Sequence, residues 1–398
     1  MQHALAHLLL FLACFLFFLK LLLAFCRRIR LPDFLSYLSV GVLTGLVMEI
    51  GSGLGQGRWF ASTPSFAVNL LLTVCSAVFF FWLAANFRVA FSRGLPAGTG
   101  RKALLVGLVT FLVLSAGGLL VFIGPELLMA PVLGTIFMTL NVGPLIAAKI
   151  KQPGRQQTRI VESYAVSLLL DMAALGGFAL AHTAYLVSEI LLFGGLKTVH
   201  WVALAGSVAV YSLLTLLWPR IGSRLPGLYG LILLLLAGGL MLTLPVSLTA
   251  VAVLLGLLWP AVQKRLPLWL QAPHWKRIPE LIAALAFAGV GFWLVEYWAV
   301  NRRLWLYLGY LILTLLIVTL ILATIQHGKQ KEAVPILALL FSRGEVSLLL
   351  LAQAVLAHLI TPTLFVAAVL VVVFSTLLNQ LLYANPQKSI LDKRMRQR

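Results

Sequence analysis

Charged side chains are scarce in this sequence, and acidic ones are the scarcest. Only 10% of the 398 residues are charged, against roughly 25% in an ordinary soluble domain. Hydrophobic residues make up 61% of the chain, and its mean hydropathy is +1.03. This composition excludes a soluble globular protein and predicts an all-α polytopic membrane protein.

Other absences narrow the function. The three cysteines form no CxxC pair or metal-ligand cluster, and no phosphate loop of the form G-x-x-x-x-G-K-[ST] occurs. We find no nucleophile, base and orienting group at a common depth, so an enzyme is not expected, nor a cofactor or a resident metal. The N-terminus lacks a basic region and cleavage site, so its apolar stretch is expected to remain as a membrane span. Without a nucleotide site, energy for transport would come from an ion gradient.

The basic residues are what remains in excess. There are 30 Lys and Arg against 11 Asp and Glu, which gives a net charge of +19. These bases lie in short clusters between apolar spans, without the basic face that nucleic-acid binding needs. We therefore expect anionic lipids of the bilayer surface as their partner, and no nucleic acid.

Apolar runs of about 20 residues predict about 13 transmembrane helices. They lie near residues 3–26, 32–50, 66–87, 103–124, 127–149, 160–187, 198–218, 226–244, 246–263, 279–300, 303–325, 333–357 and 361–383.

The distribution of bases orients these helices. One set of alternate loops, with the C-terminal tail, carries about 24 Lys and Arg, whereas the opposite loops carry about 4. The N-terminus is therefore expected outside and the C-terminus in the cytoplasm. No loop is long enough for a soluble domain, so we expect one membrane domain over 1–383 and a short basic cytoplasmic tail over 384–398.

Asp171 is the prominent acidic residue at membrane depth. It lies about eleven residues from each end of its predicted span, and helical spacing places Ser167 on the same face. A carboxyl group near the midplane is costly and marks an ion site by default. The alternative is a structural carboxyl that is protonated or bonded to a neighbouring helix.

Two spans are interrupted at mid-depth. One carries Asn141, Gly143 and Pro144, and the other carries Arg343 and Glu345 on either side of a glycine. Broken segments at corresponding places are typical of a transporter binding site, although ordinary helix kinks are the alternative. We expect the two breaks to face each other, with Arg343 near the aspartate of the polar helix or at the C-terminal end of the facing half-helix.

The sequence around these features resembles the monovalent cation:proton antiporters, particularly the branch of the potassium efflux antiporters. The stretch "RIRLPDFLSYLSVGVLTG" resembles the family's pattern before its second helix, and "YAVSLLLDMAAL" resembles its aspartate helix. The stretch "LFSRGEVSLLLLAQAV" is similar to its second crossing break, and "FSTLLNQLLY" to the end of its last helix. The resemblance extends loosely from about Arg28 to Tyr383.

The resemblance implies a sodium/hydrogen exchanger fold with inverted repeats and two crossing broken helices. It implies exchange of protons for Na⁺ or K⁺ in the inner (plasma) membrane of a bacterium. It also leaves a homodimer open as the assembly. The residues expected to bind the ion or proton are Asp171, Asn141, Thr139, Ser167, Glu345 and Arg343.

The sequence also departs from that family. Leu170 stands where a polar residue is usual, and no lysine occurs between Leu304 and Ile325. One carboxylate without that lysine favours electroneutral exchange. Because several family positions are changed, two alternatives stay open: a transporter-fold protein that acts as a membrane partner or sensor without transport, and a gated cation channel.

Overall fold

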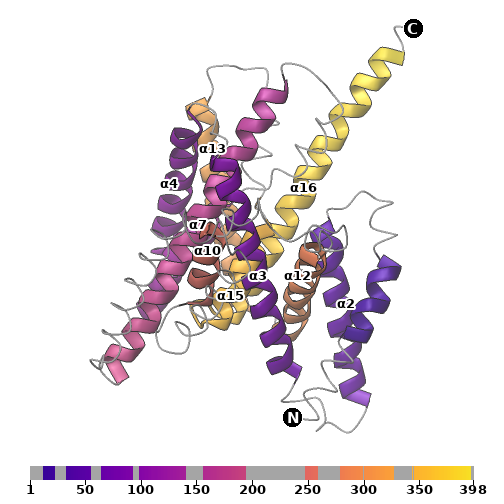
Figure 1. Ribbon diagram of the computed structural model, residues 1–398, viewed down its shortest axis with the longest axis vertical. Helices are drawn as coiled ribbons and strands as arrows, with labels where there is room; N and C mark the ends of the chain where they lie inside the picture. Colours follow the sequence, from indigo (N-terminus) through magenta and orange to yellow (C-terminus); the bar gives the residue numbers. More distant parts are fainter. Residues whose placement is uncertain are drawn as a thin grey trace, which may run out of the picture. The chain divides into compact units, whose positions relative to one another are not determined.

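The computed structural model describes residues 12–22, 33–54, 64–92, 98–139, 156–193, 247–258, 278–298, 300–326, 343 and 345–395, and these contain helices and no strands (Figure 1). Within this part of the chain, five helices are long and apolar enough to cross a membrane. They contain the segments Val68–Phe87, Thr99–Gly118, Ala165–Leu186, Arg302–Ile325 and Pro362–Asn379. The prediction of an all-helical membrane protein is confirmed at this level.

Most of the predicted spans that fall on described residues coincide with helices. The helices are α2 (Asp33–Leu54), α3 (Pro64–Ser92), α4 (Thr99–Gly118), the 3₁₀ turn η1 (Gly124–Leu128), α5 (Met129–Ile136), α7 (Gln156–Phe193), α10 (Leu248–Leu258), α12 (Ile278–Glu296), α13 (Arg302–Gln326), α15 (Glu345–Leu356) and α16 (Pro362–Met395). A shorter apolar helix, Leu12–Leu22, precedes them. The predicted spans at 198–218 and 226–244 lie outside the described residues, so the total of about 13 helices and the inverted repeats stay predictions.

The last helix is longer than predicted. We expected it to end near residue 383, before a basic tail, but α16 continues to Met395 (Figure 1). The stretch after Tyr383 contains Gln, Leu, Lys, Arg and Met, which are good helix formers, and the helix continues through Pro386 among them. The hydrophobic pattern marks the end of the apolar span near residue 383, but it does not mark the end of the helix, which is at Met395.

The chain contacts divide the protein into two compact units. The first comprises Met1–Thr73, Leu95–Ala174 and Ala284–Arg398, and the second comprises Val74–Gly94 and Leu175–Ala283. In the second unit, the Ser247 hydroxyl donates to the Ala179 carbonyl oxygen at 3.5 Å. The site described below lies entirely in the first unit.

Small residues let helices of the first unit approach closely. A Cβ atom at Gly118 of α4 would overlap the Cβ of Ala130 in α5. The same helix also contacts α13, where the Tyr310 hydroxyl donates to the Leu114 carbonyl at 2.6 Å. Within the same unit, a Cβ at Gly41 of α2 would overlap the Ala288 carbonyl of α12. Such close backbone contact is the usual way that helices pack in lipid.

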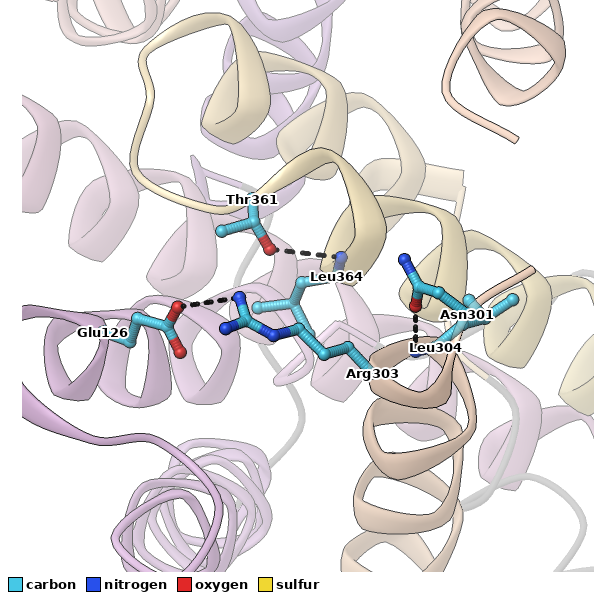
Figure 2. Close-up of polar contacts among 6 residues, drawn as sticks. All are labelled: Glu126, Asn301, Arg303, Leu304, Thr361 and Leu364. Atoms are coloured by element: carbon cyan, nitrogen blue, oxygen red, sulfur yellow. Dashed lines mark hydrogen bonds and ion pairs between the residues drawn. The ribbon is translucent and has the colours of Figure 1, made fainter. Parts of the chain in front are cut away.

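One end of the first unit gathers the starts of three segments (Figure 2). Arg303 at the start of α13 pairs with Glu126 of η1, with Nη1 and Oε1 3.6 Å apart. The Asn301 side chain accepts from the Leu304 amide at 2.9 Å and caps α13, and Thr361 caps α16 in the same way. Three helical segments that begin at the same end run in the same direction. The predicted topology also requires one direction for these segments, because they are the fifth, eleventh and thirteenth predicted spans.

One face of α13 exposes large apolar side chains. The exposed residues on this face follow the helical repeat of three, four or seven residues. They include Trp305, Leu306, Leu313, Leu316 and Leu320. In water such a stripe would cost free energy, whereas lipid tails are as apolar as leucine. This face is suited to contact with lipid.

Candidate functional site

The polar site is built where α5 ends. The helix stops at Ile136, and Phe137 and Met138 form a turn that leads to Thr139. We expected the break at Asn141, Gly143 and Pro144, so the helix ends about five residues earlier than predicted. Those three residues lie outside the described part of the chain. Because the last carbonyls of a helix lack partners within it, this end offers the Ile136 and Phe137 oxygens to other groups.

The predicted second break coincides with the start of a described helix. Arg343 is not helical, and α15 begins at Glu345. Glu126–Ile136 and Glu345–Leu356 are short apolar helices of the kind that cross only part of a bilayer. Twelve residues of helix span about 18 Å, roughly half of a 30 Å hydrocarbon core. The two short helices contact each other.

Arg343 joins the two breaks. Its side chain is 0% exposed, and its guanidinium Nη1 donates to the Phe137 carbonyl oxygen at 2.7 Å. Its backbone amide donates to the Ser375 hydroxyl of α16 at 3.4 Å. Of the two positions expected for Arg343, the structure shows the one at the C-terminal end of the facing half-helix. A cation is stabilised there by the partial negative charge of the helix end.

The rest of the guanidinium has no partner in the part of the chain that the structure describes. The Arg343 Nε and Nη2 atoms are buried and make no hydrogen bond. The guanidinium therefore acts on the end of α5 through its bond to Phe137.

Two hydroxyl groups complete the junction. The Thr139 hydroxyl lies 3.3 Å from the Ile136 carbonyl oxygen, to which it donates, and it also contacts the Ser347 hydroxyl of α15. The Ser347 hydroxyl lies 3.4 Å from the same carbonyl. Hydroxyl oxygens that donate their hydrogen to a carbonyl keep lone pairs for another ligand. Both side chains are fully buried.

Asp171 lies in α7 among apolar neighbours. The side chain is 9% exposed, and its Oδ1 has no hydrogen-bond partner among the described residues. The adjacent Leu170 belongs to a core cluster with Met138, next to Thr139, packed against it. A Cβ atom added at Gly107 of α4 would lie 3.1 Å from the Leu170 side chain and 3.7 Å from the Met138 side chain. Both side chains thus pack against the same point of α4, which places this part of α7 beside the end of α5.

Glu345 differs from its neighbours in exposure. It is the first residue of α15, and its side chain is exposed, whereas Arg343 and Val346 on either side of it are buried. The predicted residues Thr139, Arg343 and Glu345 lie where α5 ends and α15 begins. Asp171 follows Leu170, which packs with Met138 beside this junction.

The remaining candidates have different outcomes. Ser167 is buried one helical turn before Asp171, as its spacing predicted. Asn141 lies outside the described residues. Sequence reasoning missed Ser347 and Ser375, whose hydroxyls contact the junction. The only signal for Ser347 is a small polar residue in the first turn after the second break.

Short apolar helices that end against each other, with buried polar groups at their ends, are also found around the binding sites of membrane transporters. The chain is similar in fold to a solved structure of the sodium proton antiporter MjNhaP1 from Methanocaldococcus jannaschii, with a TM-score of 0.54 and 16% sequence identity. The match covers 96% of this chain and 98% of that one. No protein-family profile matches the sequence, and no curated protein is similar to it. The chain therefore has the antiporter fold that its sequence motifs predicted.

Proposed function

We propose that the protein is a secondary active antiporter that exchanges protons for a monovalent cation, Na⁺ or K⁺, at Asp171. The observation that carries this proposal is the Asp171 side chain, which is buried in an apolar span and has a carboxylate oxygen without a hydrogen-bond partner among the described residues. A buried carboxylate needs a cation or a proton to offset its charge. Competition between these two ligands for one group is the simplest form of antiport.

The groups around Asp171 suit this exchange. An arriving cation loses its water, and the hydroxyls of Thr139 and Ser167, with the Asn141 amide, replace it as neutral ligands in our proposal. Arg343 holds the end of α5 by its bond to Phe137 and so fixes the place of Thr139 two residues further on. The ionised carboxylate carries the cation across, and the protonated carboxyl returns without it.

Several finer features belong to the same proposal. One ion-binding carboxylate, with no lysine in α13, favours an electroneutral exchange of one cation for one proton. The sequence motifs favour the potassium-efflux branch, a single membrane domain over 1–383 with about 13 helices, and a bacterial inner membrane. The distribution of bases favours an external N-terminus and a cytoplasmic C-terminus.

A dye-quench assay in inverted membrane vesicles tests this function. A pH gradient should dissipate when Na⁺ or K⁺ is added to vesicles with the wild-type protein. Asp171→Asn should abolish this response with the protein level unchanged, because the amide has the same size but cannot alternate between charged and neutral forms. Asp392→Asn is the matched control, since Asp392 lies in α16 beyond the apolar segment Pro362–Asn379.

Two outcomes would contradict the proposal. Robust antiport by Asp171→Asn would remove this carboxylate from the mechanism. No response of the wild-type protein to any monovalent cation would favour a transporter fold that acts as a membrane partner or sensor.

A further inference from the structure

The exposed apolar face of α13 has a basic end. Arg302, the first residue of this helix, is exposed and makes no ion pair or hydrogen bond with the residues that the structure describes. With 3.6 residues per turn, Arg302, Leu313 and Leu320 lie within about 20° of one another around the helix axis. The free guanidinium therefore stands at the end of the same stripe that the exposed leucines form.

The stripe is interrupted by a glycine. Gly309 lies seven residues, or about two turns, after Arg302, and a Cβ atom there would meet nothing within 4 Å. The side chains one turn before and after it, Trp305 and Leu313, are 65% and 59% exposed. Because Gly309 has no side chain, these two larger residues leave a notch between them on the exposed face.

The exposed face of α4 offers a comparison within the same unit. Arg101 is exposed near the start of α4, and the apolar residues that follow it include Leu108, which is 52% exposed. Leu108 lies seven residues after Arg101, the position that Gly309 has relative to Arg302. The two faces thus share a basic end and an apolar stripe, but of these two the face of α13 alone has a glycine at that position.

The charge at the start of α13 favours an anionic head group. Arg303 pairs with Glu126, with 3.6 Å between Nη1 and Oε1 (Figure 2), so the charge of Arg302 is left uncompensated at this end. An arginine side chain presents several N–H donors in a plane, which suits the oxygens of a phosphate group. Trp305, one turn further on, is of the residue type that gathers at the level of lipid head groups.

The length of the apolar stripe agrees with one layer of lipid. Trp305 and Leu316 are eleven residues apart in α13, and so about 16 Å apart along its axis. One leaflet contributes about 15 Å to a hydrocarbon core of about 30 Å. A lipid whose phosphate lies at Arg302 can therefore extend its chain past Gly309 along most of this stripe.

We propose that this face of α13 binds one anionic glycerophospholipid, with its phosphate group on Arg302 and an acyl chain in the notch at Gly309. The inference concerns a surface outside the ion site and does not depend on the antiport function. Because α13 packs against both α4 and α16, a lipid bound there stabilises the helices of the first unit. The face of α4, which lacks the notch, holds lipid that exchanges freely.

Lipid binding to the delipidated protein in detergent tests the basic end. In native mass spectrometry, the first phosphatidylglycerol should bind about fivefold more tightly than phosphatidylcholine with the same chains, the contribution of one basic residue near a lipid surface. Arg302→Gln should remove this preference by weakening phosphatidylglycerol alone. Arg101→Gln is the matched control and should keep the preference of the wild type.

A second variant tests the notch. Gly309→Leu should lower the affinity of both lipids, because the new side chain occupies the space that takes the acyl chain. A Cβ atom at Gly309 has open space around it, so the variant should fold. Gly100→Leu is the control, since Gly100 at the start of α4 is equally open and lies outside the proposed site.

Photo-crosslinking locates the lipid without any substitution. Phosphatidylglycerol with a diazirine in one acyl chain should label residues 305–316 of α13 in the wild-type protein more than residues 104–112 of α4. Equal labelling of the two faces would mean ordinary boundary lipid and would overturn the site. Wild-type affinity for phosphatidylglycerol in either Arg302→Gln or Gly309→Leu would overturn it as well.

Discussion

Arg343 and Phe137, 206 residues apart in the chain, are joined by a 2.7 Å hydrogen bond from the guanidinium Nη1 to the carbonyl oxygen. This bond ties the end of α5 to the segment that precedes α15. It gives the buried Arg343 a role that a neutral side chain cannot fully replace, because it supplies both a donor and a positive charge to a helix C-terminus.

We predict that Arg343→Met destabilises the protein more than Arg343→Lys. Lysine keeps a cationic donor of similar reach, whereas methionine leaves the Phe137 carbonyl unpaired, which costs about 1 to 3 kcal/mol. Thermal unfolding of the detergent-purified variants measures the difference. An equal or higher melting temperature for Arg343→Met would show that the buried charge costs more than its bond contributes.

The Thr139 and Ser347 hydroxyls should behave as one unit. They contact each other and share the Ile136 carbonyl, so the two single variants Thr139→Val and Ser347→Ala should each cost nearly as much as the double variant. A coupling of about 0.5 to 1.5 kcal/mol is expected from a double-mutant cycle on thermal stability and on apparent cation affinity. The single variant Ser39→Ala is a control, because that hydroxyl bonds only within α2, to Leu35. Additive effects would mean that the hydroxyls act separately.

The contact between α4 and α5 supports the half-helix, and Gly118 is its test. Gly118→Ala places a methyl group on Ala130 and should destabilise the protein by about 1 to 3 kcal/mol. Gly309→Ala in α13 is the matched control, because a Cβ there meets nothing within 4 Å. The control should be neutral or more stable by up to about 1 kcal/mol. A melting temperature for Gly118→Ala equal to that of the control contradicts the packing.

Topology is open to a labelling experiment in intact cells. With Cys14, Cys26 and Cys75 replaced, a cysteine at Arg302 should react with a membrane-impermeant thiol reagent added outside, because Arg302 is exposed in an expected external loop. A cysteine at Lys276, in an expected cytoplasmic loop, should react only after the cells are opened. External labelling at Lys276 would reverse the predicted orientation or change the helix count.

The sequence predicted which polar residues lie within the membrane spans, but it did not predict which groups they contact. A charge within an apolar run is visible in the sequence, because its cost requires an explanation, and this singled out Asp171, Arg343 and Glu345. The helix end at Ile136 was not visible, since Gly134 stays inside the helix and the turn itself is made by the apolar residues Phe137 and Met138. Its cause is tertiary: Arg343 and Ser347 satisfy the carbonyls that the helix leaves open.

The length of α16 has a practical consequence. Its 34 residues extend about 51 Å, and the apolar segment Pro362–Asn379 accounts for only about 27 Å of this. About 24 Å of the same rod continues beyond that segment, in one piece with the residues that hold Ser375 against Arg343. A fluorescent probe attached near Met395 is therefore connected to the junction by an unbroken helix. A rotation or tilt of α16 during turnover would move that probe by several ångströms, so its fluorescence would report motion of the helix without any label inside the membrane.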